Sequence, residues 1–260
     1  MKYLLASAAV LILMAVGVWM IAIPEEVILN IIGASVSGSG MRVECAGFRK
    51  DPFFGFRADG LSLRKGEREL IAAGNLSGRI NVLSLVRLRL PLTFSGRIGN
   101  GTISGTAELL RKDHELALTV KDVNTDAVPF VGLFGIKGNA VLTGSMLLRN
   151  GHGGIRFDLK DLKDMNGSFG TVSIPLGDFR SGQGALEVSS DRVRITSFTL
   201  EGPDIYARVK GDAADGRLNL TLEVMPEKAF IDRNLMLGLL ERYQVSPGHY
   251  VIPLTNQLSL

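Results

Sequence analysis

The sequence predicts a mainly β protein: a long curled antiparallel sheet, a half-barrel or trough, with a few short helices, preceded by one N-terminal transmembrane helix. Three observations predict this fold. The first 23 residues are almost entirely apolar, apolar and polar residues alternate through most of the remaining chain, and glycines punctuate that alternation. The expected organisation is a transmembrane anchor over 1–23, a juxtamembrane helix and flexible joint over 24–40, and a β-rich domain over 41–260.

The anchor is predicted from the run between Leu4 and Ile23, which only Ser7 interrupts. About 20 residues at ~1.5 Å rise per residue give a helix of ~30 Å, the thickness of a bilayer core. A cleaved secretory signal is the alternative, but its apolar stretch is ~7–15 residues long and ends at a small-residue cleavage site. The sequence from Trp19 to Pro24 has no such site. An uncleaved anchor is therefore favoured, with Trp19 as an interfacial aromatic residue.

The charges that flank the run predict its orientation. Lys2 and the amino terminus precede it, Glu25 and Glu26 follow it, and the next basic residue is Arg42. The positive-inside rule then places the N-terminus in the cytoplasm and the bulk of the chain on the other side. In a Gram-negative envelope this is a single-pass inner-membrane protein with a periplasmic domain.

The composition bounds the function. The net charge is +3, from 29 basic and 26 acidic side chains that are interspersed, and the chain has four tyrosines and one tryptophan. Without a basic stripe or many aromatic residues for stacking, no nucleic-acid partner is expected. Cys45 is the single cysteine, so the domain has no internal disulfide. Because Cys45 lies in a predicted strand, we interpret it as a small packed residue rather than a nucleophile.

Three segments after the anchor predict helices. Pro24 to Ile32 continues helically from the anchor. The segment from Asp126 to Phe134 opens with a capping Asp and carries Pro129 in its first turn. The third helix spans 226 to about 243 and has an apolar face, formed by Phe230, Leu235 and Leu239 with Tyr243. That face must be buried, either as a permanent seal on the open side of the sheet or as a lid.

The strands follow from a period of two, which is clearest over 102–109, 115–121 and 217–224. In the last stretch, Leu220 and Leu222 are expected to face the interior, and Asn219 and Thr221 the solvent. Turn signals recur at a spacing of about 8–12 residues, which predicts hairpins. They lie at 65–66, 99–101, 112–113, 150–151, 190–191 and 214–216.

A loose repeat runs through the β region. Its unit is a glycine, a few residues, Ser/Thr-Gly and an alternating strand, and it occurs at 74–78, 101–105 and 138–144. Glycines in strands weaken pairing but permit bends and close approach, which suits a sheet that curls into a trough. The apolar face of such a sheet is either a core filled by its own side chains or a groove that shields acyl chains. For a chain of this size the filled core is favoured.

Longer stretches resemble a known family. Residues 118–130 and 135–146 form a strand, a short capped apolar helix and a glycine-spaced strand pair, a pattern of the type II secretion system protein N family in its short form, within the wider AsmA-like envelope proteins. Residues 194–211 and 248–258 are similar to later units of these families, with Asn256 where the pattern has glycine. The anchor followed by Pro24 to Val27 is also similar to the short form.

The resemblance covers nearly the whole chain and implies a function. It implies an inner-membrane-anchored periplasmic subunit of a type II protein secretion system, which acts by assembly and by interaction with other secretion-system subunits. The wider family implies the alternative, a lipid-binding or lipid-transfer protein of the bacterial envelope whose partner is phospholipid.

No catalytic, cofactor-binding or metal site is predicted, and the protein is not expected to be an enzyme. The histidines lie in or beside turn-like stretches and are interpreted as solvated loop residues: His114, His152 and His249. A group of carboxylates near Lys160 and Lys163 is interpreted as a solvated strand surface of mixed charge, with a catalytic carboxylate pair as the alternative: Asp161, Asp164 and Asp178.

Overall fold

The structure is a computed structural model that describes residues 14, 16–22, 24–26, 29, 41–82, 84, 88–108, 115–132, 136–162, 164–169, 172–174, 176–189, 192–214, 217–233 and 241–257. Most of the predicted anchor and joint lies outside these residues. Within them, no helix is both long and apolar enough to cross a membrane. The chain forms two compact units, Met1–Lys112 and Asp113–Leu260, and this boundary falls inside the range that the sequence analysis treats as one domain.

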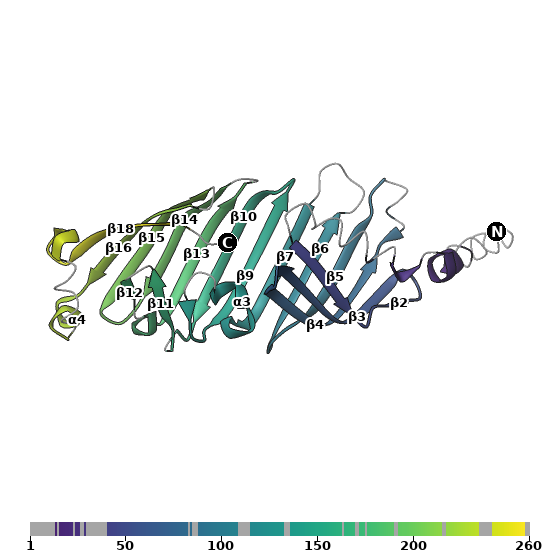
Figure 1. Ribbon diagram of the computed structural model, residues 1–260, viewed down its shortest axis with the longest axis horizontal. Helices are drawn as coiled ribbons and strands as arrows, with labels where there is room; N and C mark the ends of the chain where they lie inside the picture. The colour runs from purple at the N-terminus through teal and green to yellow at the C-terminus, as the bar shows by residue number, and fades with distance from the viewer. Residues whose placement is uncertain are drawn as a thin grey trace, which may run out of the picture. The chain divides into compact units, whose positions relative to one another are not determined.

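The fold is mainly β, with extensive antiparallel sheet and few helices, as the sequence predicts; closure of the sheet is not seen in the described part. In the first unit, antiparallel strands follow the order β1-β3-β4-β5-β6, and β2 also pairs with β3 (Figure 1). A single π-helical turn, η1 (Val18–Ala22), precedes them. The strands are β1 (Met41–Ala46), β2 (Arg49–Asp51), β3 (Gly55–Lys65), β4 (Arg68–Ile80), β5 (Pro91–Ile98) and β6 (Gly101–Glu108).

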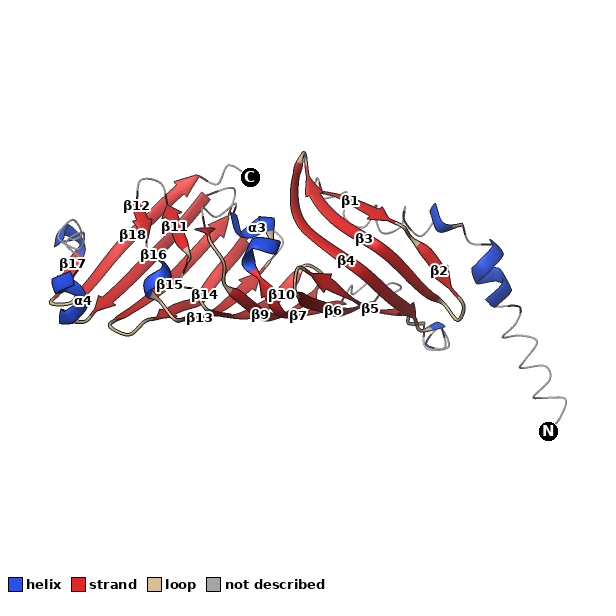
Figure 2. Ribbon diagram, turned by 90° about the horizontal axis from the view of Figure 1, so that it is seen from below, coloured by secondary structure: helices blue, strands red, loops and turns tan. Residues whose placement is uncertain are grey.

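The second unit has a large sheet in the order β7-β9-β10-β13-β14-β15-β16-β18-β17 and a small one in the order β12-β11-β8. Figure 2 shows β11, β12 and α3 on the same side of the large sheet. The large sheet contains β7 (Glu115–Asn124), β9 (Val141–Arg149), β10 (His152–Lys160), β13 (Ser181–Val188), β14 (Arg192–Glu201), β15 (Ile205–Ala214), β16 (Arg217–Pro226), β17 (Gln244–Ser246) and β18 (His249–Gln257). The remaining elements are η3 (Thr125–Ala127), α3 (Pro129–Gly132), β8 (Ile136–Lys137), β11 (Asn166–Phe169), β12 (Val172–Ile174), η4 (Leu176–Asp178) and α4 (Lys228–Arg233).

Strand β16 shows how the period of two becomes a buried face. Leu220 and Leu222 are 6% and 3% exposed, and Asn219, which precedes Leu220, is exposed, as the predicted register requires. Leu222 lies between its partners Val209 on β15 and Ile252 on β18. Thr221 differs from the expectation, because it is half-buried rather than solvated.

The predicted helix over 126–134 is η3 followed by α3, but the predicted Asp126 cap is wrong. The N-cap position of η3 is Asn124, and it makes no side-chain capping hydrogen bond. Thr125 holds the segment instead. Its hydroxyl accepts a hydrogen bond from the Ala140 amide (2.9 Å) and donates one to the Gly138 carbonyl (3.3 Å), so the 4%-exposed side chain is fully satisfied.

Of the predicted helix over 226–243, α4 forms 228–233, whereas Pro226, predicted to open the helix, is the last residue of β16. Phe230 is buried in the core cluster of the unit, and Tyr243 packs against that cluster, as the apolar spacing predicts. Leu235 and Leu239 lie outside the described residues.

Candidate functional site

A row of alternating glycine and phenylalanine residues crosses the inner face of the second unit. Gly144 on β9 is paired with Phe157 on β10, Phe157 with Gly184 on β13, and Gly184 with Phe198 on β14. The two rings lie 5.6 Å apart between centroids, tilted by 42°. Two aromatic rings therefore meet across an intervening strand, because that strand has glycine between them.

Only glycine fits at these positions, because atoms of the neighbouring strand lie where a Cβ would be. A Cβ built on Gly184 would collide with the Phe157 ring, and a Cβ on Gly144 would lie 2.8 Å from the Arg156 carbonyl oxygen and 3.1 Å from the Phe157 Cβ. The Phe157 ring thus packs directly on the backbone of Gly184 on the neighbouring strand. The rings of the row therefore lie close to the plane of the sheet.

The first unit contains a row of the same kind. Phe56 on β3 is paired with Gly78 on β4, Gly78 with Phe94 on β5, and Phe94 with Gly105 on β6. A Cβ on Gly78 would collide with the Phe56 ring. Phe48 extends the row on the other side, with its ring stacked on Phe56 at 5.7 Å between centroids.

The glycine repeat of the sequence and these rows coincide. The final glycines of the three repeats are Gly78, Gly105 and Gly144, and each lies in one of the rows. The repeat therefore locates both glycines of the first unit's row, but only Gly144 and not Gly184 of the second unit's row. The phenylalanine partners are not predicted, because they lie on neighbouring strands whose register the repeat does not define.

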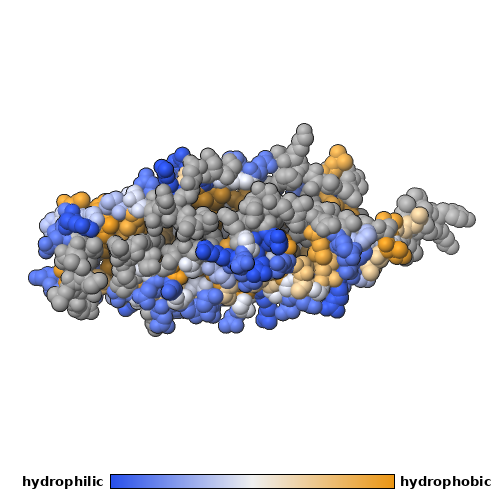
Figure 3. Space-filling model, in the orientation of Figure 1, coloured by the Kyte–Doolittle hydropathy of each residue, from blue (hydrophilic) through white to orange (hydrophobic). Residues whose placement is uncertain are grey.

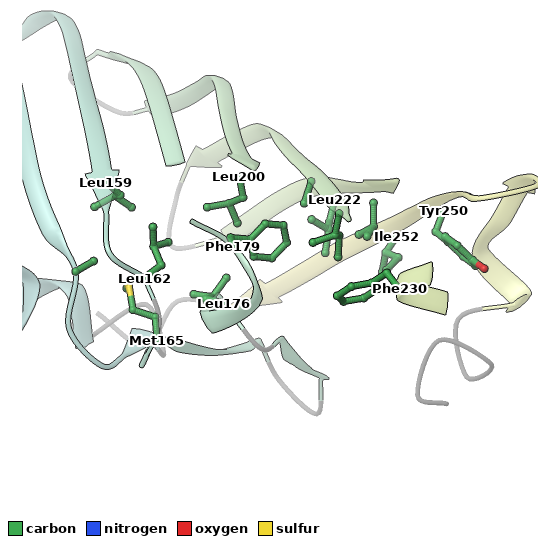
Figure 4. Packing of buried hydrophobic residues seen from close by; sticks show 14 residues of the cluster. Leu159, Leu162, Met165, Leu176, Phe179, Leu200, Leu222, Phe230, Tyr250 and Ile252 are labelled. Atoms are coloured by element: carbon green, nitrogen blue, oxygen red, sulfur yellow. The ribbon is translucent and has the colours of Figure 1, made fainter. Parts of the chain in front are cut away.

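The inner face of the second unit is covered by its own chain. The segment that connects β10 to β13 turns back over the large sheet and places Leu162, Met165, Leu176 and Phe179 on it, with exposures of 0%, 2%, 7% and 3% (Figure 4). Phe230 of α4 joins the same cluster, which includes Leu200, Leu222 and Ile252 of the sheet. Figure 3 shows apolar residues recessed between the hydrophilic margins of this unit.

The inner face of the first unit is less completely buried. Ala73, Leu76 and Ile98 are buried, whereas Phe94 and Ile103 on the same face remain half-buried. The two units therefore differ in how far their phenylalanine and glycine rows are shielded from solvent.

The outer faces are polar and carry exposed ion pairs between neighbouring strands. Arg149 pairs with Glu115 at 3.0 Å and Arg194 with Asp212 at 3.2 Å, each across a direct register position. Exposed pairs of this kind contribute about 0.2–1 kcal/mol, so they support solubility and register more than stability.

The carboxylate segment corrects one sequence interpretation. Asp161, Asp164 and Asp178 are exposed, but they do not form a strand surface. They lie in the connection between β10 and β13, where Leu162 and Met165 between them are buried against the sheet. Lys160 is exposed, and Lys163 lies outside the described residues.

Among the described residues, His152 and His249 lie on different strands of the second unit, and Cys45 lies on β1 of the first. His152 is exposed at the start of β10, and His114 lies outside the described residues. His249 is half-buried rather than solvated, because the turn before it pairs it with Ser246, and its Nε2 has no hydrogen-bond partner among the described residues. Burial raises the pKa of the Cys45 thiol, so less reactive thiolate forms at a given pH. In the part of the chain that the structure describes, no three His, Cys, Asp or Glu side chains are grouped to hold a metal ion.

Comparisons with protein-family models, with curated proteins and with solved structures found no match to this chain.

Proposed function

We propose that this protein is an inner-membrane-anchored periplasmic subunit of a type II protein secretion system, and that it acts by assembly and protein interaction rather than by catalysis. The family resemblance of the sequence suggests this function. The observation that favours it over lipid transfer is the covered inner face of the second unit. We further propose that the sheets curl into troughs, with this cover filling the trough of the second unit.

The cover removes the surface that an acyl chain would need. Leu162 is 0% exposed and Met165 2% exposed, and both belong to one cluster with Leu200 of the sheet. Close-packed interiors have little space for a guest molecule unless the covering segment moves away. The faces left for interaction in this unit are its polar surface and its strand edges.

Strand β18 supplies such an edge. Within the described residues it pairs with β16 over Val224–Arg217, whereas β17 pairs with it only at Tyr250 and His249. The stretch Val251–Gln257 includes Pro253, and proline within sheets is confined largely to edge strands, strand starts and bulges. A strand of a partner subunit can add to an edge of this kind through backbone hydrogen bonds.

Site-specific photocrosslinking tests the proposal in the native host. A photoreactive amino acid at exposed Thr255 of β18 should crosslink to another subunit of the secretion system, identified by mass spectrometry. The same group at buried Ile252 is the control and should give no crosslink to another protein. Deletion of the gene should leave type II substrates in the periplasm. Normal secretion after deletion, together with no subunit crosslinked from Thr255, would refute the assignment.

A second candidate function is lipid binding, and the half-buried face of the first unit favours it. Phe56, Phe94 and Ile103 retain accessible surface on one side of the sheet. Phospholipid extracted from the purified full-length chain and quantified by mass spectrometry separates the two functions. We expect no stoichiometric phospholipid after exchange into lipid-free detergent. Recovery of one or more tightly held lipids per chain would favour the AsmA-like function instead.

A further inference from the structure

Trp19, the only tryptophan of the chain, joins the end of the apolar run to strand β2 and the turn that follows it. Trp19 is 4% exposed, its indole N–H donates a hydrogen bond to the Asp51 carbonyl oxygen (3.0 Å), and its ring contacts that of Phe54 at 5.7 Å between centroids. The sequence predicts Trp19 to be an interfacial aromatic residue, and the structure adds that its side chain is buried against the protein. Its indole faces the protein because Asp51 at the end of β2 supplies an acceptor and Phe54 in the following turn supplies an aromatic partner.

Lys50 completes this attachment. Its Nζ donates hydrogen bonds to the carbonyl oxygens of Trp19 (2.9 Å) and Met20 (2.8 Å), within the helical turn Val18–Ala22. Carbonyls in the last turn of a helix lack intrahelical partners, and a cation near them is favourable. The Lys50 amide also donates to the Glu25 carboxylate (3.3 Å), so both sides of Pro24 are tied to β2.

The turn after β2 has an unusual backbone. Phe53 and Phe54 have φ angles of 60° and 63°, in the left-handed region that bulky side chains rarely occupy. Turns with two such residues normally use Asn, Asp or Gly. The conformation sends the two rings to different environments: Phe54 packs on Trp19, whereas Phe53 points outward and is 64% exposed.

Like Phe53, apolar side chains of η1 are exposed to solvent. Val18 is 54% exposed and Ile21 85% exposed, on the helical turn whose Trp19 contacts the Phe53–Phe54 turn. In the sequence, Trp19 lies four residues before Ile23, where the apolar run ends. The direct hydrogen bond from Trp19 therefore places the Phe53 turn at the level where that run ends.

We propose that the Phe53 turn is a second membrane contact, which rests in the interfacial region of the bilayer that the apolar run enters and which fixes the first unit against the membrane surface. The occupant of this apolar patch is phospholipid. The proposal depends on the anchor of the proposed function. It explains why phenylalanine occupies position 53, which glycine or asparagine would adopt without strain, because an exposed phenylalanine ring can bury itself at the boundary of headgroups and acyl chains.

Lipid quenching of a site-specific probe tests the proposal on the full-length chain. A Cys45→Ser background carrying Phe53→Cys is labelled with an environment-sensitive fluorophore and reconstituted in phosphatidylethanolamine and phosphatidylglycerol vesicles that contain spin-labelled lipid. Glu67→Cys is the matched control, because Glu67 is exposed in the turn at the opposite end of β3, ~35 Å away at ~3.3 Å per residue. We expect severalfold stronger quenching at position 53 than at position 67.

Three outcomes separate this inference from the proposed function. Equal quenching at the two positions, or none at position 53 in vesicles that retain the protein in alkaline carbonate, would refute the membrane contact and leave the anchor intact. Release of the protein by carbonate would refute the anchor itself. A third outcome is that spin-labelled lipid does not quench the probe at position 53, and that its fluorescence changes only when envelope proteins are added. This outcome would assign the turn to a protein partner and would also refute the proposal.

Discussion

Replacing Gly184 with alanine is the sharpest test of the glycine and phenylalanine rows. The added Cβ would collide with the Phe157 ring on the neighbouring strand, so either the ring or the strand must move. Overpacking costs about 1–3 kcal/mol. The loss of glycine's freedom in the unfolded chain offsets about 0.4–1 kcal/mol of this. The net expectation is a loss of about 0–2.6 kcal/mol in the free energy of unfolding.

Gly154→Ala provides the matched control on the adjacent strand. A Cβ at Gly154 meets only the Leu186 carbonyl oxygen, at 3.7 Å, which is an ordinary contact. The free energy of unfolding of Gly154→Ala should equal that of the parent chain or exceed it by about 0.4–1 kcal/mol, because the substitution affects only the unfolded state. The comparison thus separates steric overlap from the general effect of removing a glycine.

The assay is urea unfolding of the full-length chain in detergent, followed by circular dichroism in the far ultraviolet. A second variant, Gly184→Ala with Phe157→Leu, tests the mechanism, because a smaller side chain leaves room for the new methyl group. The costs of the two substitutions should then fall short of additivity by at least about 0.5 kcal/mol. Equal behaviour of Gly184→Ala and Gly154→Ala, or strictly additive costs in the double variant, would refute the close packing described for this row.

Three further predictions follow from single side chains. Leu220→Asp would bury an unpaired charge and should abolish cooperative folding in the same assay, whereas Thr221→Asp should remain folded; similar behaviour of the two would contradict the register of β16. Thr125→Val leaves the buried Ala140 amide without its acceptor and should cost about 1–3 kcal/mol in unfolding free energy; no change would contradict the described hydrogen bonds. Burial raises the pKa of Cys45, so at pH 8 this thiol should react with iodoacetamide more slowly than free cysteine does. The rate of its reaction should keep rising at higher pH. A rate equal to that of free cysteine would contradict its burial.

The sequence predicts the strands well because their signal is local. Leu220 and Leu222 face inward simply because side chains alternate along a strand. The pairing of Phe157 with Gly184 depends instead on register, which turn lengths and bulges decide. The register of the β13–β14 pair shifts in this way between Ala185 and Leu186, next to Gly184. No pattern within a single strand contains that information.

The cover of the second unit was not predictable for a different reason. Leu162 is flanked by Asp161 and Lys163, so the segment has the composition of a solvated surface. Its burial depends on a large sheet face that only the assembled strands create. The short strands of the cover, such as β12 with three residues, are also too brief to show a period. The sequence correctly predicts that Asp161, Asp164 and Asp178 are exposed to solvent, but it does not predict the burial of the apolar side chains between them.

The order of the strands has a consequence for how the chain is made. Within the first unit, β3, β4, β5 and β6 each pair with the strand that precedes them, and the same holds along β14, β15 and β16 of the second. Short loops between paired strands keep the entropy of closure small. A polypeptide that is synthesised from its N-terminal end can therefore add each of these strands in turn to the strand that precedes it. In these stretches each new strand finds its partner already in place, which shortens the time that an unpaired strand is open to aggregation.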